Sequence, residues 1–329
     1  MSAEIYGDDL AVYAQTAWHG KGITYGHLLS VNEYAENPWI FQAERQELYA
    51  KDVIDGETYY TALSEWDGVN NGFVIRRSDD GFPLNVGVTE GRGITQYDEM
   101  DSAVEKLVEQ GFSPGVASKG TLNHGRKAYV TLEMGEPLDI EGYSKIHKYF
   151  TLTDAHDGTI AASGRPTVGV VVCANTFAAY ILGVKSTWSI KHTRNASSYL
   201  EWAIDSFVEA AKLQQQLDEQ VERLINESYL PFEFGQLKHR ILGERPDDEG
   251  RSQTSWDKVF DSITARYMDR DLDGGIRETK WGALMAVQGY EQHVQQVRGG
   301  TKEGRHLDRL LFGSMPLTEK AIHQLVSSE

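Results

Sequence analysis

Residues 150–195 read FTLTDAHDGTIAASGRPTVGVVVCANTFAAYILGVKSTWSIKHTRN and decide the fold class of the chain. They contain an uncharged run, Val168 to Val184, that is slightly short for a membrane span and is interrupted by Asn175-Thr176. Such a break is typical of a buried strand followed by a helix. We therefore predict a central strand over residues 167–173, and a short helix over residues 177–182 capped by Asn175 or Thr176.

A strand–strand–helix unit is predicted before this stretch. Residues 73–77 and 84–88 flank the turn cluster Ser78-Asp79-Asp80-Gly81, whose glycine suits a positive φ. An apolar stripe of period 3.6 then follows Asp98, the expected N-cap, and ends at Gly111. The pattern predicts a hairpin that leads into an amphipathic helix.

A second hairpin and a long helix complete the central part of the chain. The hairpin pairs residues 113–118 with 127–134, and a further strand is predicted over 148–153. Apolar residues at helical spacing predict a long helix over 197–227 that ends before Pro231. Three more helices are predicted, over residues 256–266, 280–297 and 318–326.

These elements predict an α+β fold with four regions. An antiparallel sheet is built from β-hairpin–helix units with a long helix, and a mainly helical C-terminal region follows. We expect an N-terminal arm over 1–60, a core domain over 61–239, a linker over 240–254 and the helical region over 255–329. The linker is charged and contains Gly, Pro and Ser without periodic apolar residues.

The charge balance argues against a surface that coats DNA or anionic lipid everywhere. The 329 residues have a formal net charge of −17. Nine basic and six acidic residues lie between Phe112 and Leu200, so this segment is +3 and the remainder is −20. A mildly basic centre can still present a nucleic-acid groove. The single cysteine and the acidic N-terminus favour a cytoplasmic protein without a secretory signal.

Basic and aromatic residues of the central segment supply the side chains of a single-strand binding groove. Cations contact phosphates, and flat rings stack on bases. A basic cluster is expected at the tip of the second hairpin, where Lys119, His124, Arg126 and Lys127 gather. The predicted contacts are Arg76, Arg77, Lys119, Arg126, Lys127, Tyr129, Trp188, Lys191 and Arg194.

An enzyme is the alternative interpretation. Cys173, His156 or His192, and Asp157 or Asn175 are the residue types of a thiol nucleophile, its base and its orienting group. However, Cys173 follows an apolar run typical of a buried and inert thiol. Asp157-Gly158 is also typical of a simple turn.

No metal or other cofactor is expected. His156 and His192 lack the further ligands that zinc needs. The acidic loop beginning at Asp269 resembles a calcium loop, but Lys280 takes the place of its last glutamate.

Several motifs taken together resemble one family. They are AWHGKG at 17–22, GRKAYV at 125–130, TDAHDG at 153–158, VVCANT at 171–176, KHTRN at 191–195, WGALMAV at 281–287 and LFGS at 311–314. This set is similar to the phage/plasmid-like family built on a domain of unknown function. The resemblance implies a phage or mobile-element protein that works in the bacterial cytoplasm.

The expected architecture also resembles phage single-strand annealing proteins of the RecT, Redβ and Erf type. That resemblance implies an oligomer that holds single-stranded DNA in a basic groove, with phage or host replication and recombination proteins as further partners. The function expected first is therefore DNA binding and annealing without catalysis. The alternatives are the hydrolase-like enzyme centred on His156, Asp157, Cys173 and His192, and a host-interaction or anti-defence protein without catalysis.

Overall fold

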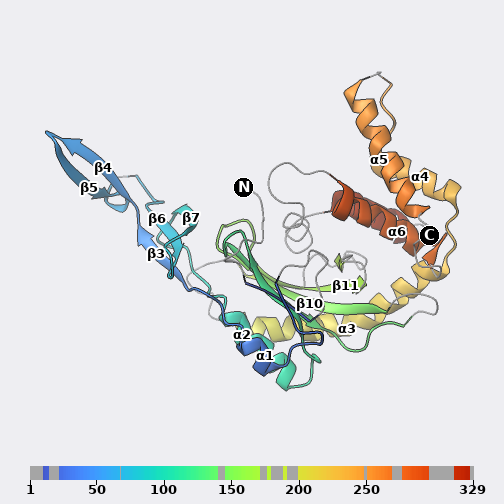
Figure 1. The fold of residues 1–329 in the computed structure, drawn as a ribbon, viewed down its shortest axis with the longest axis horizontal. Coiled ribbons are helices and arrows are strands. Elements are labelled where there is room, and N and C mark those ends of the chain that lie inside the picture. Colours follow the sequence, from blue (N-terminus) through green and yellow to red (C-terminus); the bar gives the residue numbers. More distant parts are fainter. Residues whose placement is uncertain are drawn as a thin grey trace.

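The computed structural model describes ten stretches of the chain. They are residues 10–14, 22–66, 68–139, 145–170, 176–178, 188–190, 199–247, 250–268, 276–295 and 315–326. Within them the fold is the predicted mixture of antiparallel sheets, hairpin–helix units and a helical C-terminal region (Figure 1).

The largest sheet has the strand order β12-β11-β10-β9-β8-β1-β2, and β13 also pairs with β11. Its pairs are antiparallel except for β1 with β2. The bounds are β1 Ala11–Tyr13, β2 Ile23–Thr24, β8 Val116–Leu122, β9 Lys127–Glu133, β10 Ile146–Ala155, β11 Ala162–Val170, β12 Thr176–Ala178 and β13 Trp188–Ile190. The predicted second hairpin is confirmed as β8–β9, and it occupies the middle of the sheet.

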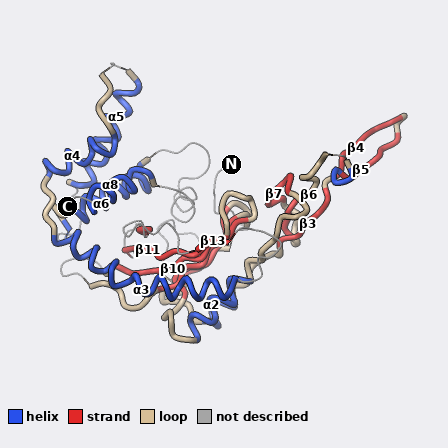
Figure 2. Tube along the Cα trace, turned by 180° about the vertical axis from the view of Figure 1, so that it is seen from behind, coloured by secondary structure: helices blue, strands red, loops and turns tan. Residues whose placement is uncertain are grey.

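One face of this sheet is apolar and is covered by α3 (Tyr199–Asn226), the predicted long helix. Phe150 and Leu152 of β10 point to the same side, because residues two apart share a face. The Phe150 ring meets Phe207 of α3 edge-on at 5.3 Å. The helix α2 (Glu99–Glu109) adds Ala103, Val104 and Leu107 to the same core, and Figure 2 shows α2 beside α3.

The opposite face of the sheet carries many polar residues, which are buried or partly buried. Cross-strand hydrogen bonds join Thr131 to Thr151 at 3.3 Å and Thr153 to Ser163 at 2.9 Å. At one end His147 Nδ1 lies 2.5 Å from Glu133 Oε1. These groups are paired along the sheet, as buried polar groups must be.

A second, three-stranded sheet has the order β3-β6-β7, with β3 Ala43–Glu47, β6 Phe73–Arg77 and β7 Pro83–Val88. The first predicted hairpin is therefore confirmed as β6–β7, and Gly81 has the expected positive φ of 76°. From this sheet β4 (Tyr49–Ile54) and β5 (Glu57–Ala62) project as a two-stranded ribbon (Figure 1). The short elements α1 (Val31–Ala35) and η1 (Leu63–Glu65) complete the N-terminal third of the described residues.

The C-terminal helices form a second core. They are α4 Pro231–Leu242, α5 Arg251–Tyr267, α6 Lys280–Gly289 and α8 Pro316–Val326, and the π-helix η4 (Tyr290–Val294) continues α6. Every residue from Trp281 to Gly289 is buried, as expected of a helix that is apolar all round. Val221, Leu224 and Ile225 of α3 join this core, while Phe207 and Ala210 join the core of the sheet.

The structure corrects four local predictions. Thr176–Ala178 is a strand, where a helix was expected from Phe177 onward. Asp98 precedes α2 but makes no side-chain cap, because its carboxylate accepts from Gln42 instead. The expected linker over 240–254 includes the end of α4 and the first turn of α5. Residues 43–62, most of which belong to the expected N-terminal arm, form the strands β3, β4 and β5.

In the part of the chain that is described, no helix has the combined length and apolar character needed to cross a bilayer.

Candidate nucleic-acid interface

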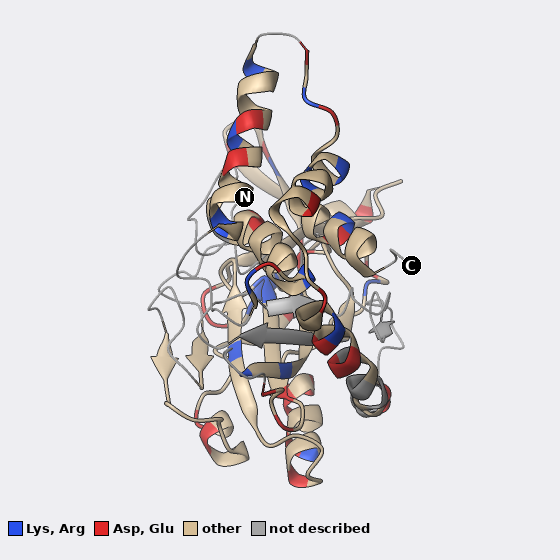
Figure 3. Cartoon of the chain, turned by 90° about the vertical axis from the view of Figure 1, so that its right-hand side faces the viewer, with Lys and Arg blue, Asp and Glu red and all other residues tan. Residues whose placement is uncertain are grey.

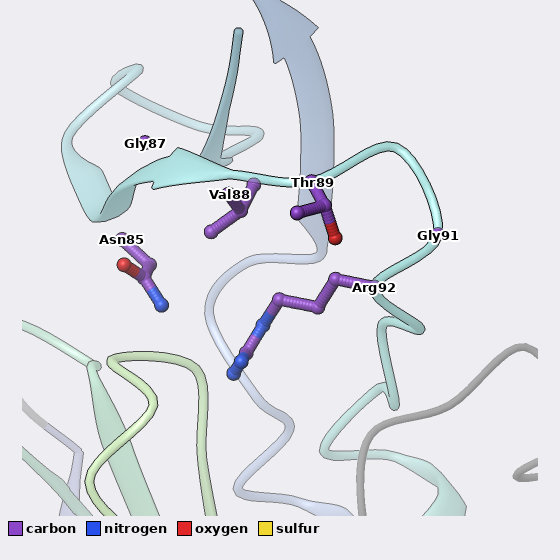
Figure 4. A pocket seen from close by; sticks show the side chains of 6 residues that line it. All are labelled: Asn85, Gly87, Val88, Thr89, Gly91 and Arg92. Atoms are coloured by element: carbon purple, nitrogen blue, oxygen red, sulfur yellow. The ribbon is translucent and has the colours of Figure 1, made fainter. Parts of the chain in front are cut away.

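A polar corner forms where the β6–β7 hairpin, the segment after β7 and the β10–β11 turn meet. Asn85 Nδ2 donates to the backbone oxygen of His156 at 2.9 Å, and Arg92 Nη2 donates to the same oxygen at 3.3 Å. An open depression of about 440 Å³ lies beside these contacts. It is lined by Asn85, Gly87, Val88, Thr89, Gly91 and Arg92, and in Figure 4 the side chains of Asn85, Thr89 and Arg92 extend into one space.

Backbone geometry explains why the corner forms here. Gly158, in the β10–β11 turn, has a φ of 79°, and a Cβ there would lie 3.3 Å from Asn85 Nδ2. Asp157 closes this turn by accepting from the backbone N and the hydroxyl of Thr159, at 2.9 and 2.6 Å. A glycine with positive φ therefore brings the turn close to β7.

Arg92 is the cation that lines the depression at this corner. A guanidinium presents five N–H donors and stays charged at any physiological pH. Its Nε is buried and has no hydrogen-bond partner among the described residues. The chain places this arginine in a Gly91-Arg92-Gly93 loop directly after β7. The arrangement suits a phosphate or another oxyanion that approaches the depression.

Three further arginines surround the β6–β7 hairpin. Arg126 donates from Nε and Nη2 to Pro83 O, at 3.3 and 3.0 Å. Arg76 lies 3.5 Å from Glu44, and its Nε also lacks a partner within the described chain. Arg45 of β3 donates to the backbone oxygen of Arg92. Apart from the buried Arg77 at the end of β6, four guanidinium groups thus lie around one short hairpin.

Two aromatic rings accompany these cations. The Arg126 guanidinium lies 5.1 Å from the centre of the Phe82 ring, and Phe82 lies 4.8 Å from the His124 ring. Neither ring is fully buried. Flat rings next to arginines are the combination that binds unpaired bases together with their phosphates. The charge elsewhere is mixed, and along the helices seen in Figure 3 basic and acidic residues alternate.

Four residues predicted to contact nucleic acid are buried, contrary to the exposed hairpin tip that we expected. Arg77 lies over the Phe41 ring at 4.7 Å and donates to both oxygens of Asp79, which lowers the pKa of that carboxyl. Lys127 is buried at the start of β9. Tyr129 is also buried, and its hydroxyl bonds that of Tyr13 at 3.2 Å. These three side chains stabilise the fold from inside.

Lys119 is the fourth buried residue and sits in an aromatic cage. Its Nζ lies 3.9 Å from the Tyr34 ring centre and 4.3 Å from that of Trp39. Asp101 is 3.5 Å away and also accepts from the Tyr34 hydroxyl and from Trp39 Nε1. Burial lowers the pKa of Lys119 to about 8, although Asp101 opposes this shift. Cation–π contacts with two rings, rather than a phosphate, hold this ammonium.

The remaining predicted residues are placed only in part. Trp188 belongs to β13, opposite Gly164 of β11, and only its backbone is described. Lys191, Arg194, His192 and Cys173 lie outside the described residues, as does the acidic loop at 269–275. Of the predicted cations, Arg126 lies beside Pro83 and Phe82 of the β6–β7 hairpin, whereas Arg76 shares the opposite face of β6 with its partner Glu44.

His156 and Asp157 are the two residues of the alternative catalytic set that the structure describes, and both make contacts that stabilise the fold. The His156 ring is buried and stacks on Tyr97 at 4.5 Å. Asp157 stabilises the β10–β11 turn by accepting from the backbone N of Thr159, as the Asp-Gly pair predicts. The neighbouring Asp154 is buried and accepts from Thr95 at 2.6 Å. Within the described stretches, His, Cys, Asp and Glu side chains form no group of three or more that could hold a metal ion.

The sequence patterns did not identify Arg92, Arg45 or Asn85. Arg92 carries a local signal, because a cation between two glycines directly after a strand can approach a ligand closely. Arg45 and Asn85 have no local sequence signal, since their positions at the corner depend on the pairing of β3, β6 and β7.

Residues 88–311, more than half of the chain, match a family described as a domain of unknown function, DUF932. The chain belongs to this family. The match begins at the last residue of β7 and includes Arg92, Arg126 and the whole of β8 to β11, so most of the polar corner lies within the DUF932 domain. No curated protein and no solved structure matches the chain.

Proposed function

We propose that this DUF932 protein binds single-stranded DNA and acts on it as an oligomer, as a recombination protein of a phage or mobile element does. One observation carries the proposal: Arg45, Arg76, Arg92 and Arg126 surround the β6–β7 hairpin in a chain whose net charge is −17. Two of these guanidinium groups have an Nε without a partner in the described stretches. Guanidinium groups gathered in this way favour a phosphate ligand.

Single strands are favoured over a duplex by the type of surface. Reading a major groove requires a helix or a two-stranded ribbon that enters it with base-contacting side chains. The polar corner instead offers a shallow depression, with Phe82 and His124 beside Arg126. Rings of this kind stack on bases whatever the sequence, and each stacked base contributes about 1–3 kcal/mol.

The number of arginines sets the expected salt dependence. Each phosphate contact to a single strand contributes about −0.7 to the slope of log K against log salt. Four arginines therefore predict a slope of about −3. The rest of the chain is acidic, which disfavours further phosphate contacts and therefore a steeper slope.

The test is fluorescence anisotropy of a labelled single-stranded oligonucleotide over a series of salt concentrations. We expect Arg92→Gln and Arg126→Gln each to weaken binding and to reduce the slope by about 0.7. Arg245→Gln is the matched control, because Arg245 pairs with the exposed Asp257 in the helical region, far from the corner. No binding at low salt, or equal effects of the corner and control variants, would contradict the proposal.

A further inference from the structure

The β4–β5 ribbon is the least supported pair of strands in the described chain. Its turn consists of Asp55 and Gly56, whose φ values of 52° and 83° are those of a tight two-residue hairpin. Val53 and Tyr60 are 65% and 66% exposed. An isolated two-stranded hairpin is marginal in water, so this ribbon would gain much from a further strand.

The two edges of the ribbon differ in charge. The middle of β4 carries Lys51 and Asp52, and charges on an edge strand discourage pairing with another chain. From Thr58 to Ala62, β5 carries no charge and no proline, and its residues Thr58, Tyr59, Tyr60 and Thr61 all favour strands. The edge of β5 is therefore the unprotected one.

The register shows which backbone groups face outward. Ile54 and Glu57 flank the two-residue turn and so form a hydrogen-bonded pair, as do Asp52 and Tyr59. The intervening pair, Val53 and Thr58, is not hydrogen-bonded across the ribbon. Thr58 and Tyr60 therefore present their N–H and C=O groups to the free edge of β5.

We propose that β5 pairs antiparallel with β5 of a second copy of this chain, so that a four-stranded sheet β4-β5-β5-β4 forms about a two-fold axis. An axis perpendicular to the sheet keeps every residue on its own face, so residues of equal parity oppose one another. With Tyr59 opposite Tyr59 of the second copy, Thr58 opposes Tyr60 and Glu57 opposes Thr61. This register has no like-charge pair, and its aromatic and Thr–Tyr pairs are stabilising.

The same two-fold antiparallel pairing is less favourable at the edge of β4. A two-fold pairing centred on the middle of β4 places Lys51 opposite Lys51 or Asp52 opposite Asp52 of the second copy. Like charges directly opposite each other are destabilising. The ribbon also projects away from the rest of the molecule in Figure 1, which leaves the β5 edge accessible to a second copy. The inference deepens the oligomeric part of the proposed function, on which it rests, and it does not require DNA.

Two proline substitutions test this edge with a built-in control. Val53 and Thr58 face each other, and both direct their N–H outward, so a proline at either position leaves the β4–β5 hydrogen bonds in place. Thr58→Pro removes a donor from the β5 edge, and Val53→Pro removes one from the β4 edge. The mass of each full-length protein is measured by size-exclusion chromatography with light scattering, without DNA.

We expect the wild type and Val53→Pro to self-associate alike, and Thr58→Pro to show at least a tenfold larger dissociation constant. An identical thermal transition in the three proteins shows that the body of the chain is intact. A monomeric wild type, or equal behaviour of the two proline variants, would overturn the inference.

The anisotropy titration above separates this inference from the proposed function. Assembly that depends on β5 without any DNA binding would leave the edge contact standing and reject the DNA proposal. If the chain binds DNA and Thr58→Pro does not change its assembly, the DNA proposal stands and the β5 contact is rejected.

Discussion

The hairpins β8–β9 and β4–β5 are similar in sequence and opposite in surroundings. The strand β9 reads KAYVTLE and β5 reads ETYYTA, so both combine aromatic or aliphatic residues with threonine. Every side chain of β9 is buried, whereas β5 is mostly exposed. β8–β9 has β1 and β10 as neighbours, and β4–β5 has no neighbouring strand among the described ones. The comparison teaches that adjoining strands and helices, rather than strand sequence, decide whether a hairpin belongs to the core.

The largest difference is expected when one apolar side chain is truncated in each hairpin. Leu132→Ala in β9 removes a fully buried side chain, and we expect it to lower the free energy of unfolding by about 2–5 kcal/mol. Val53→Ala in β4 should change that free energy by no more than about 0.5 kcal/mol. Urea denaturation of both variants measures the difference. Similar losses would show that the ribbon is packed against the body in solution.

The two turns provide an intermediate difference. Gly56 and Gly125 both have positive φ, 83° and 80°, so alanine is strained at either position by about 1–2 kcal/mol. A Cβ at Gly125 would also lie 2.3 Å from Cε1 of Phe41, while a Cβ at Gly56 meets nothing within 4 Å. We expect Gly125→Ala to cost about 1–3 kcal/mol more than Gly56→Ala, because of this overlap. Melting temperatures of the two variants test the prediction, and equal temperatures would contradict it.

A further difference is a pH dependence that comes from the buried hairpin. The folded-state pKa of Lys119 is about 8, below the usual 10.5, because burial disfavours its charge. Between these two values the unfolded chain binds more protons, so stability should rise with pH there, by at most about 1.4 kcal/mol per unit. Lys238, with a pKa also lowered to about 8 by burial, acts in the same direction.

Substitution identifies the contribution of Lys119. Lys119→Met should flatten part of the rise in stability from pH 8 to pH 10, as measured by urea denaturation at each pH. Lys51→Met in the β4–β5 ribbon is the control and should keep the slope of the wild type. An unchanged slope in Lys119→Met would show that this lysine does not carry the effect.

Much of the fold was predictable because local patterns and tertiary contacts agree. The long helix was predicted over 197–227 and spans Tyr199–Asn226. The turns at Gly81 and Gly158 have the positive φ that their sequences indicate. The ribbon β4–β5 was not predicted, since a strand without neighbours imposes no clear alternation of buried and exposed positions. A helix was expected from Phe177 onward, where the structure has the strand Thr176–Ala178, because a short apolar run does not distinguish a helix from a strand.

The candidate site was less predictable than the fold. Sequence position suggests that Lys119 and Lys127 belong to an exposed tip, but Lys119 is enclosed by the Tyr34 and Trp39 rings, and Lys127 is buried at the start of β9. Arg126 lies at the surface as expected, because its side chain lies over the Phe82 ring rather than within the sheet. Whether a cation is buried depends on the elements that pack against it from elsewhere in the chain, and no local sequence pattern contains that information.

The helix α3 has a further consequence for the way this protein unfolds. Its 28 residues extend about 42 Å, and its two ends supply side chains to different hydrophobic cores. If the C-terminal helices detached, Val221, Leu224 and Ile225 would face water on a helix that the sheet still holds. Neither core can therefore open without a cost to the other, and the sheet and the helical region should behave as one cooperative unit in hydrogen exchange.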